Sequence, residues 1–257
     1  MKRIRVYDFG LRMFHWLFAL SFLFAFGIAK TVDDESPFFY LHIVAGLFMG
    51  YLLVFRLLWG FLGTTYARFS SFNLHPAELI RYGKQLLSSR TTIYTGHNPG
   101  SSYAALAMFV LGTGLIITGM FMALGFQKEF FEAWHEMLAN GFLITVILHL
   151  FGLAWHQRTH RDMLYLSMIT GKKMAVPETV EISRTRPWVG ILLVVMGVFW
   201  VGYIHAHYQE GTRTIQLFGV RLQAGEIEQE LESYDDDEEE EYLNREDHEE
   251  KCDEDEP

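Results

Sequence analysis

Cysteine is almost absent from this chain of 257 residues, which contains only Cys252. One cysteine excludes a disulfide bond within the chain, a cysteine-ligated iron–sulfur cluster and the CxxCH sequence that attaches haem covalently. The sequence also shows no nucleophile motif, catalytic dyad or phosphate-binding loop. These absences leave covalent catalysis without candidate residues.

Acidic residues are missing from five long apolar runs, apart from Glu136 near the start of the fourth. The runs cover 13–29, 38–62, 102–125, 134–156 and 188–203. A helix of about 20 apolar residues crosses the hydrocarbon core of a bilayer. We therefore predict an all-α integral membrane protein. Its parts are a four-helix bundle within 1–187, a fifth transmembrane helix at 188–207 and an external acidic tail at 208–257.

Three shorter features refine this prediction. Asp8 precedes the first apolar run and is expected to cap its helix. Residues 74–88 have helical periodicity and are expected to lie on the membrane surface. Glycines in the third run (Gly112, Gly114 and Gly119) are expected to permit close approach of a helix or a cofactor.

The charge of the chain is divided unevenly. Residues 225–257 hold 19 acidic and two basic residues, a net of −17, whereas the rest of the chain carries +7. Lys and Arg gather at the N-terminus and in the segments 63–100 and 157–187. The positive-inside rule places these three segments in the cytoplasm and, with five spans, the C-terminus outside.

The fourth run contains two histidines that share one face of its helix. His135 and His149 are separated by about 21 Å along a helix axis and by about 40° around it. Both imidazoles therefore face the same neighbours, near opposite edges of the hydrocarbon core. Polar groups at such positions need partners.

Two other histidines fall at matching depths. His42 lies near the outer end of the second run, level with His135, and His15 lies near the inner end of the first run, level with His149. Neutral imidazole is an axial ligand of haem, and two imidazoles give a six-coordinate iron suited to electron transfer. We predict two non-covalent b haems, the outer one on His42 and His135 and the inner one on His15 and His149. Arg56, on the face of His42, is expected either to neutralise an inner haem propionate or to extend to the inner interface.

Two other functions are compatible with intramembrane histidines. A cation transporter with a histidine relay would be expected to pair its histidines with intramembrane Asp or Glu, which the runs lack apart from Glu136. A non-redox membrane anchor for a partner protein would not need histidines at matched depths.

Several segments together resemble the bacterial di-haem cytochrome b561 group, which includes the cytochrome b subunit of nickel–iron hydrogenases. They are VYDFGLRMFHW, HIVAGLFMGYLLVFRLLWGFLG followed by YARFSSF, GHNPGS, and HEMLANGFLITVILHLFG, and the resemblance covers about residues 5–175. The four axial ligands of that family carry over onto His15, His42, His135 and His149.

The resemblance implies a multi-pass cytochrome of the bacterial inner membrane. Such a protein passes electrons between a periplasmic redox partner and membrane quinone, and any catalysis is quinone chemistry beside the inner haem. No nucleic acid is expected among its partners. The acidic tail is unusual for the family. Its composition predicts disorder, and its charge is expected to attract a basic partner such as a c-type cytochrome.

Overall fold

The computed structural model describes residues 3–87, 94, 96–160, 164–174, 181–182 and 185–225. Among these residues, five helices are long and apolar enough to cross a membrane. They are α1 (Phe9–Thr31), α2 (Tyr40–Leu62), α4 (Pro99–Ala123), α5 (Lys128–His160) and α7 (Pro187–Ala206). The five predicted spans and the helical membrane fold are therefore confirmed.

Asp8 caps α1, as predicted. Its carboxylate accepts a hydrogen bond from the backbone N–H of Leu11 at 2.8 Å, and the residue is fully buried. The same carboxylate accepts from the Trp59 indole and from the Thr64 hydroxyl. A buried carboxylate needs such partners, and here they fasten the start of α1 to the end of α2.

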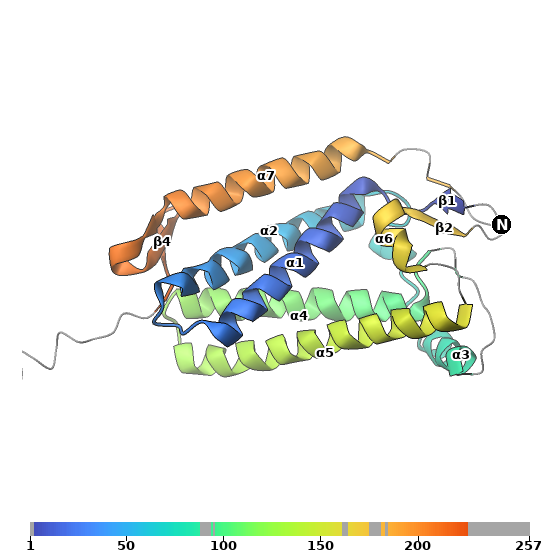
Figure 1. Ribbon diagram of the computed structural model, residues 1–257, viewed down its shortest axis with the longest axis horizontal. Coiled ribbons are helices and arrows are strands. Elements are labelled where there is room, and N and C mark those ends of the chain that lie inside the picture. The colour runs from blue at the N-terminus through green and yellow to red at the C-terminus, as the bar shows by residue number, and fades with distance from the viewer. Residues whose placement is uncertain are drawn as a thin grey trace, which may run out of the picture.

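The helices form a bundle in which α1 lies beside α2, and α4 beside α5 (Figure 1). The fifth helix, α7, packs on the outside of α1 and α2. The centre of the bundle is aromatic and aliphatic, with Phe22 and Phe142 in ring contact at 4.4 Å between centroids. Of the predicted glycines, Gly114 faces Leu138 and Gly119 faces His135, so both permit close approach of α5 to α4.

Short elements surround the end of the bundle where the chain begins, here called the N-terminal end. They are β1 (Arg3–Arg5), η2 (Phe69–Ser71), α3 (Pro76–Leu87), η3 (Leu164–Leu166), α6 (Ser167–Thr170) and β2 (Lys172–Met174). Strands β1 and β2 pair antiparallel, with Ile4 opposite Lys173. This pairing brings together two of the segments that the charge pattern assigns to one side of the membrane.

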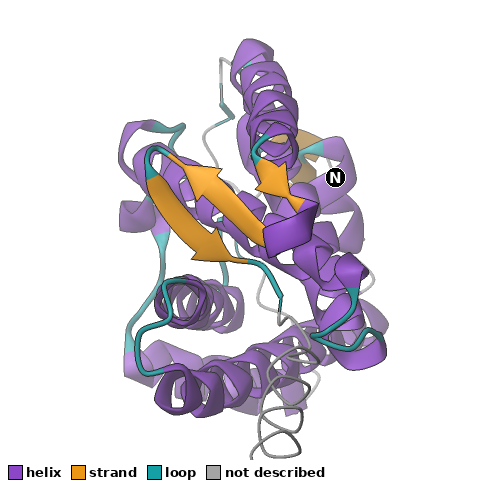
Figure 2. Cartoon of the chain, turned by 90° about the vertical axis from the view of Figure 1, so that its left-hand side faces the viewer, coloured by secondary structure: helices purple, strands orange, loops and turns teal. Residues whose placement is uncertain are grey.

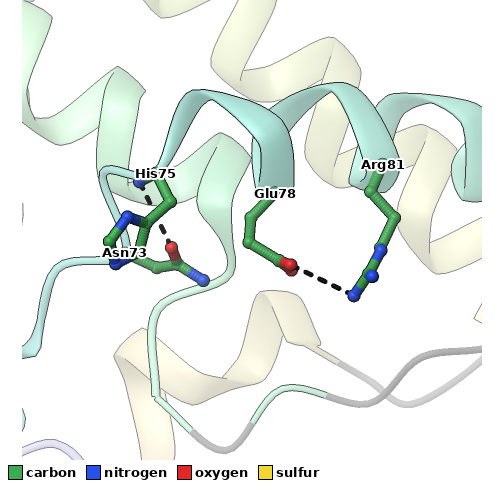
Figure 3. Close-up of polar contacts among 4 residues, drawn as sticks. All are labelled: Asn73, His75, Glu78 and Arg81. Atoms are coloured by element: carbon green, nitrogen blue, oxygen red, sulfur yellow. Dashed lines mark hydrogen bonds and ion pairs between the residues drawn. The ribbon is translucent and has the colours of Figure 1, made fainter.

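Helix α3 confirms that a helix forms within the predicted segment 74–88. Figure 3 shows its first turns, where the Asn73 side chain accepts from the backbone N–H of His75 and Glu78 forms a 3.1 Å ion pair with Arg81. Ile80 is exposed on the same helix. The polar contacts and the exposed apolar side chain agree with a helix lying along an interface.

The opposite, C-terminal end of the bundle carries a small antiparallel sheet (Figure 2). Its strands are β3 (Tyr208–Gln209), β4 (Thr214–Leu217) and β5 (Val220–Gln223), and η1 (Pro37–Phe39) and η4 (Glu210–Thr212) lie at the same end. Phe218 and Gly219 join β4 to β5 with positive φ angles of 50° and 85°. Such angles at both central residues match the twist of a two-residue hairpin.

The sheet corrects the predicted tail boundary at residue 208. Ile215, Leu217 and Leu222 are buried and contact Val44 of α2 and Ile204 of α7. This burial holds 208–223 in strands and turns rather than in a disordered tail. The prediction of disorder for 226–257 lies outside the described residues. Gly225, the last described residue, lies beside Asp34, so the tail leaves from the C-terminal end.

Candidate functional site

The C-terminal end of the bundle brings His42 of α2 and His135 of α5 into ring contact. Their centroids are 6.1 Å apart and the rings are inclined at 72°. Two imidazoles bound to one metal ion from opposite sides, with metal–nitrogen bonds of about 2 Å, have centroids roughly 6 Å apart. The predicted outer pair therefore already has the spacing of two axial ligands.

Hydrogen bonds fix the orientation of both rings. The Nδ1 atom of His42 lies 2.9 Å from the carbonyl oxygen of Ala25, an acceptor only. The Nδ1 atom of His135 lies 2.9 Å from the Thr118 hydroxyl. That hydroxyl has its own proton directed to the carbonyls of Gly114 and Leu115, so it accepts from His135. Each Nδ1 is thus a donor, which leaves each Nε2 with a lone pair for a metal.

Glycines leave room around this pair. A Cβ atom built on Gly119 would stand 3.3 Å from the His135 ring. Gly46, one turn after His42, is half-buried, yet a Cβ there would meet no other part of the described chain within 4 Å. Gly119 therefore lets the His135 ring lie against α4, and the backbone of α2 has open space beside Gly46.

The N-terminal end brings together His15 of α1 and His149 of α5. Both are half-buried, and they lie close enough to interact electrostatically. The Nδ1 atom of His15 is buried and has no hydrogen-bond partner in the described part of the chain. A Cβ atom at Gly152, one turn after His149, would also face open space. His15 and His149 thus lie at the same end of the bundle, and their binding to one haem stays a prediction.

Unpartnered polar atoms are concentrated at this end. Within the described ranges, the buried side-chain atoms without a hydrogen bond belong to Arg12, His15, Arg56, His97 and Gln157. All five residues lie toward the N-terminal end of the bundle. Buried polar groups are nearly always hydrogen-bonded in native proteins, to protein or to water, so these groups can bind water or a polar ligand at this end of the bundle.

Arg56 is buried rather than extended to water. It is 7% exposed, and its guanidinium lies 4.5 Å from the centre of the Phe69 ring and 5.8 Å from that of Phe72. These contacts hold the cation in place while one of its nitrogens remains unpaired. Its burial means that Arg56 is covered by protein rather than exposed, while its role toward a haem propionate or the interface stays a prediction.

His97 and Lys173 join Arg56 in a buried cluster that sequence reasoning missed. Lys173 donates to the Gly96 carbonyl at 2.6 Å and lies over the Tyr7 ring, and the His97 ring contacts Tyr7 and Phe72. Burial, together with the positive charges of Lys173 and Arg56, lowers the pKa of His97 to about 3. The imidazole is therefore neutral at physiological pH. Its place in GHNPGS was the only sequence signal.

Four other histidines whose side chains the structure describes do not join either pair. His156 is buried at the end of α5, with its Nδ1 atom 3.3 Å from the Tyr82 hydroxyl. His75 is exposed at the start of α3 (Figure 3). His205 and His207 are exposed at the end of α7.

The donor set fits haem better than a bare metal ion. Within the described residues, no group of three or more His, Cys, Asp or Glu side chains is placed to hold a metal. Two imidazoles supply only two ligands, whereas the four ring nitrogens of a haem complete a six-coordinate iron. Between the two pairs stands Phe142, which is seven residues from both His135 and His149 and packs on Phe18 and Phe22. Two such centres would thus be stacked along the bundle.

Comparisons with known proteins point to one family. The family model of prokaryotic cytochrome b561 matches residues 6–171. Two curated relatives, from Azotobacter chroococcum mcd 1 and Azotobacter vinelandii, are each named a probable Ni/Fe-hydrogenase B-type cytochrome subunit. Each is 24% identical over 214 residues, which covers 66% of this chain and 88% of the relative. No solved structure matches the chain.

Proposed function

We propose that this chain binds two haems and uses them to transfer electrons across the membrane. The chain belongs to the prokaryotic cytochrome b561 family and is therefore a membrane b-type cytochrome that transfers electrons. In this proposal it passes electrons between a periplasmic redox partner and the membrane quinone pool. The observation that carries it is the 6.1 Å spacing of the His42 and His135 rings, which suits two axial ligands, at one end of a bundle that holds His15 and His149 at the other.

The four histidines hold two non-covalent b haems. His42 and His135 ligate the outer haem, and His15 and His149 ligate the inner one. A bound haem supplies a one-electron Fe(III)/Fe(II) couple. The chain provides the axial nitrogens, fixes their orientation through Ala25 and Thr118, and excludes water with the aromatic core between the two sites.

Arg56 neutralises a propionate of the inner haem. A buried guanidinium with an unpaired nitrogen is suited to a carboxylate. The membrane quinone binds at the same end, where the other unpartnered polar atoms offer hydrogen bonds to its oxygens. Quinone reduction or oxidation beside the inner haem is then the reaction that the protein supports.

The charge pattern orients the protein in the bacterial inner membrane. The N-terminal end, with the basic segments, faces the cytoplasm and the C-terminal end faces the periplasm. The outer haem then meets a soluble partner. The names of the two relatives support a redox enzyme of the hydrogenase kind, and the acidic tail supports a basic partner such as a c-type cytochrome.

Haem counting tests the proposal directly. Extraction of the purified full-length protein with acidified acetone is expected to release two haems per chain, all of them non-covalent. His42→Ala or His135→Ala is expected to remove one redox component, and His15→Ala or His149→Ala the other. Loss of the same component from His15 and His42 variants would reject the pairing. A colourless protein would reject the haem proposal and favour the cation transporter or the membrane anchor.

A further inference from the structure

Helix α5 is only partly covered by the rest of the chain. Its inward face carries Leu138, Phe142 and both ligand histidines, and it packs on α4 and the aromatic core. Its other long side faces away from the bundle (Figure 1). Most lipid-facing helices are apolar on that side, because lipid offers no hydrogen bonds.

Asn140 breaks this rule at the middle of the outward face. It is exposed, and it lies about 140° around the helix from His135 and about 180° from His149. It is about 7 Å deeper in the membrane than His135. Hydroxyl side chains in the spans, such as Thr113 and Thr145, donate to the carbonyl four residues earlier. The Asn140 amide has no such bond, nor any other within the part of the chain that the structure describes.

The residues around Asn140 follow the spacing of a helix–helix seam. Six of the exposed positions are spaced alternately three and four residues apart: Met137, Asn140, Ile144, Ile147, Phe151 and Ala154; Leu148, Leu150 and Trp155 are exposed beside them. This is the 3.5-residue repeat with which two helices pack side by side. A single polar residue in such a seam fixes register and partner number. Lipid alone accounts for the apolar members, but not for the amide.

We propose that this face of α5 is the interface with a second copy of the chain. Two copies in one membrane have the same orientation, so a two-fold axis normal to the membrane brings residues of the same number to the same depth. Asn140 then meets Asn140. An amide both donates and accepts, so the pair satisfies itself without any other residue. The proposal does not depend on the haems or on the direction of electron flow.

Fluorescence energy transfer in liposomes measures the association. Donor and acceptor dyes are attached to Cys252, the only cysteine of the full-length, haem-loaded protein. Transfer is expected to rise with the protein-to-lipid ratio and to fall when unlabelled protein is added. Asn140→Leu is expected to weaken dimerisation roughly 3- to 20-fold, the range for an interhelical hydrogen bond in a membrane. Asn140→Gln, which keeps the amide, should restore much of it.

Disulfide cross-linking locates the interface. In a Cys252→Ser background, Ile144→Cys on the proposed face is expected to give a covalent dimer. Val198→Cys, 68% exposed on α7, is the matched control and is expected to give none. An unchanged haem spectrum shows that each variant is folded. No energy transfer at any ratio, an Asn140→Leu variant as associated as the parent, or equal cross-linking at Val198→Cys would each overturn the proposal.

Discussion

The hydrogen bond between His135 and Thr118 makes the outer haem site open to a selective test. Thr118→Val keeps the shape of the side chain and removes the oxygen that lies 2.9 Å from Nδ1 of His135. Without this acceptor the imidazole becomes a weaker electron donor, because a hydrogen-bonded N–H raises the basicity of the ligating nitrogen. A weaker donor stabilises Fe(III) less, so the reduction potential of the outer haem should rise.

The size of the shift follows from the strength of one neutral hydrogen bond. Such a bond contributes about 1 kcal/mol net, and about 1.4 kcal/mol corresponds to 59 mV for a one-electron couple. The upper limit is therefore about 40 mV, because only the difference between the ferric and ferrous states counts. The inner haem, on His15 and His149, should keep its potential.

A redox titration monitored by haem absorbance measures both potentials in one sample. The outer component is identified as the one that His42→Ala removes. Thr113→Val is the matched control, since the Thr113 hydroxyl, on the same helix, also donates to the carbonyl four residues earlier but forms no hydrogen bond with a histidine of the described chain. Equal shifts in the Thr113 and Thr118 variants, or a shift of the inner component, would refute the reasoning.

Three further perturbations address other parts of the molecule. Arg56→Gln should lower the potential of the inner haem by roughly 50 to 100 mV while Arg56→Lys shifts it less, because a buried cation favours the added electron; a redox titration in which only the outer component moves would contradict this. His97 has a folded pKa of about 3, below its unfolded value of about 6.5, so its contribution to stability is complete above pH 6.5 and is lost as pH falls toward 3. Denaturation of the haem-loaded protein at different pH values measures this effect. Between pH 6.5 and 5, the free energy of unfolding of His97→Gln should fall by about 2 kcal/mol less than that of the parent. The control His75→Gln, at an exposed position, should show the same fall as the parent. Deletion of 225–257 should slow electron exchange with a basic c-type cytochrome at low salt but not at 1 M salt, where the screening length is about 3 Å; equal stopped-flow rates at low salt would reject steering by the tail.

The spans and the histidine levels could be predicted because both depend on the geometry of a single helix. An apolar run fixes where a span lies, and a rise of 1.5 Å with a rotation of about 100° per residue fixes the relative places of His135 and His149. The partners of the ligands could not be predicted in this way. The carbonyl of Ala25 meets His42 only because α1 packs on α2 at one particular offset. The spacing of residues within one helix does not determine how far two helices are shifted relative to each other.

The C-terminal sheet was not predicted, because the many acidic residues of the segment 208–257 favoured a disordered tail over its whole length. The segment 214–223 alternates inward Ile215, Leu217 and Leu222 with outward polar residues, and Phe218 and Gly219 stand at the turn. Alternation around a two-residue loop is a hairpin signal. It is weak because four-residue strands are stable only on a surface that is already formed. Here the ends of α2 and α7 provide that surface.

The two ends of the bundle differ in how far the chain itself completes the site, and this difference bears on function. At the C-terminal end the Nδ1 atoms of His42 and His135 are both hydrogen-bonded to the protein. The two rings are therefore fixed, and the proposed site needs only a haem between them. At the N-terminal end Arg56 and His97 are buried, and each has a nitrogen without a hydrogen-bond partner among the described residues, a state that costs free energy unless water or a ligand supplies one. An electron-transfer centre gains from a rigid site, because little has to reorganise. A site that exchanges a substrate must instead leave donors and acceptors for that substrate. The arrangement therefore favours electron relay at the C-terminal end and ligand chemistry at the N-terminal end, which is where we propose that quinone binds.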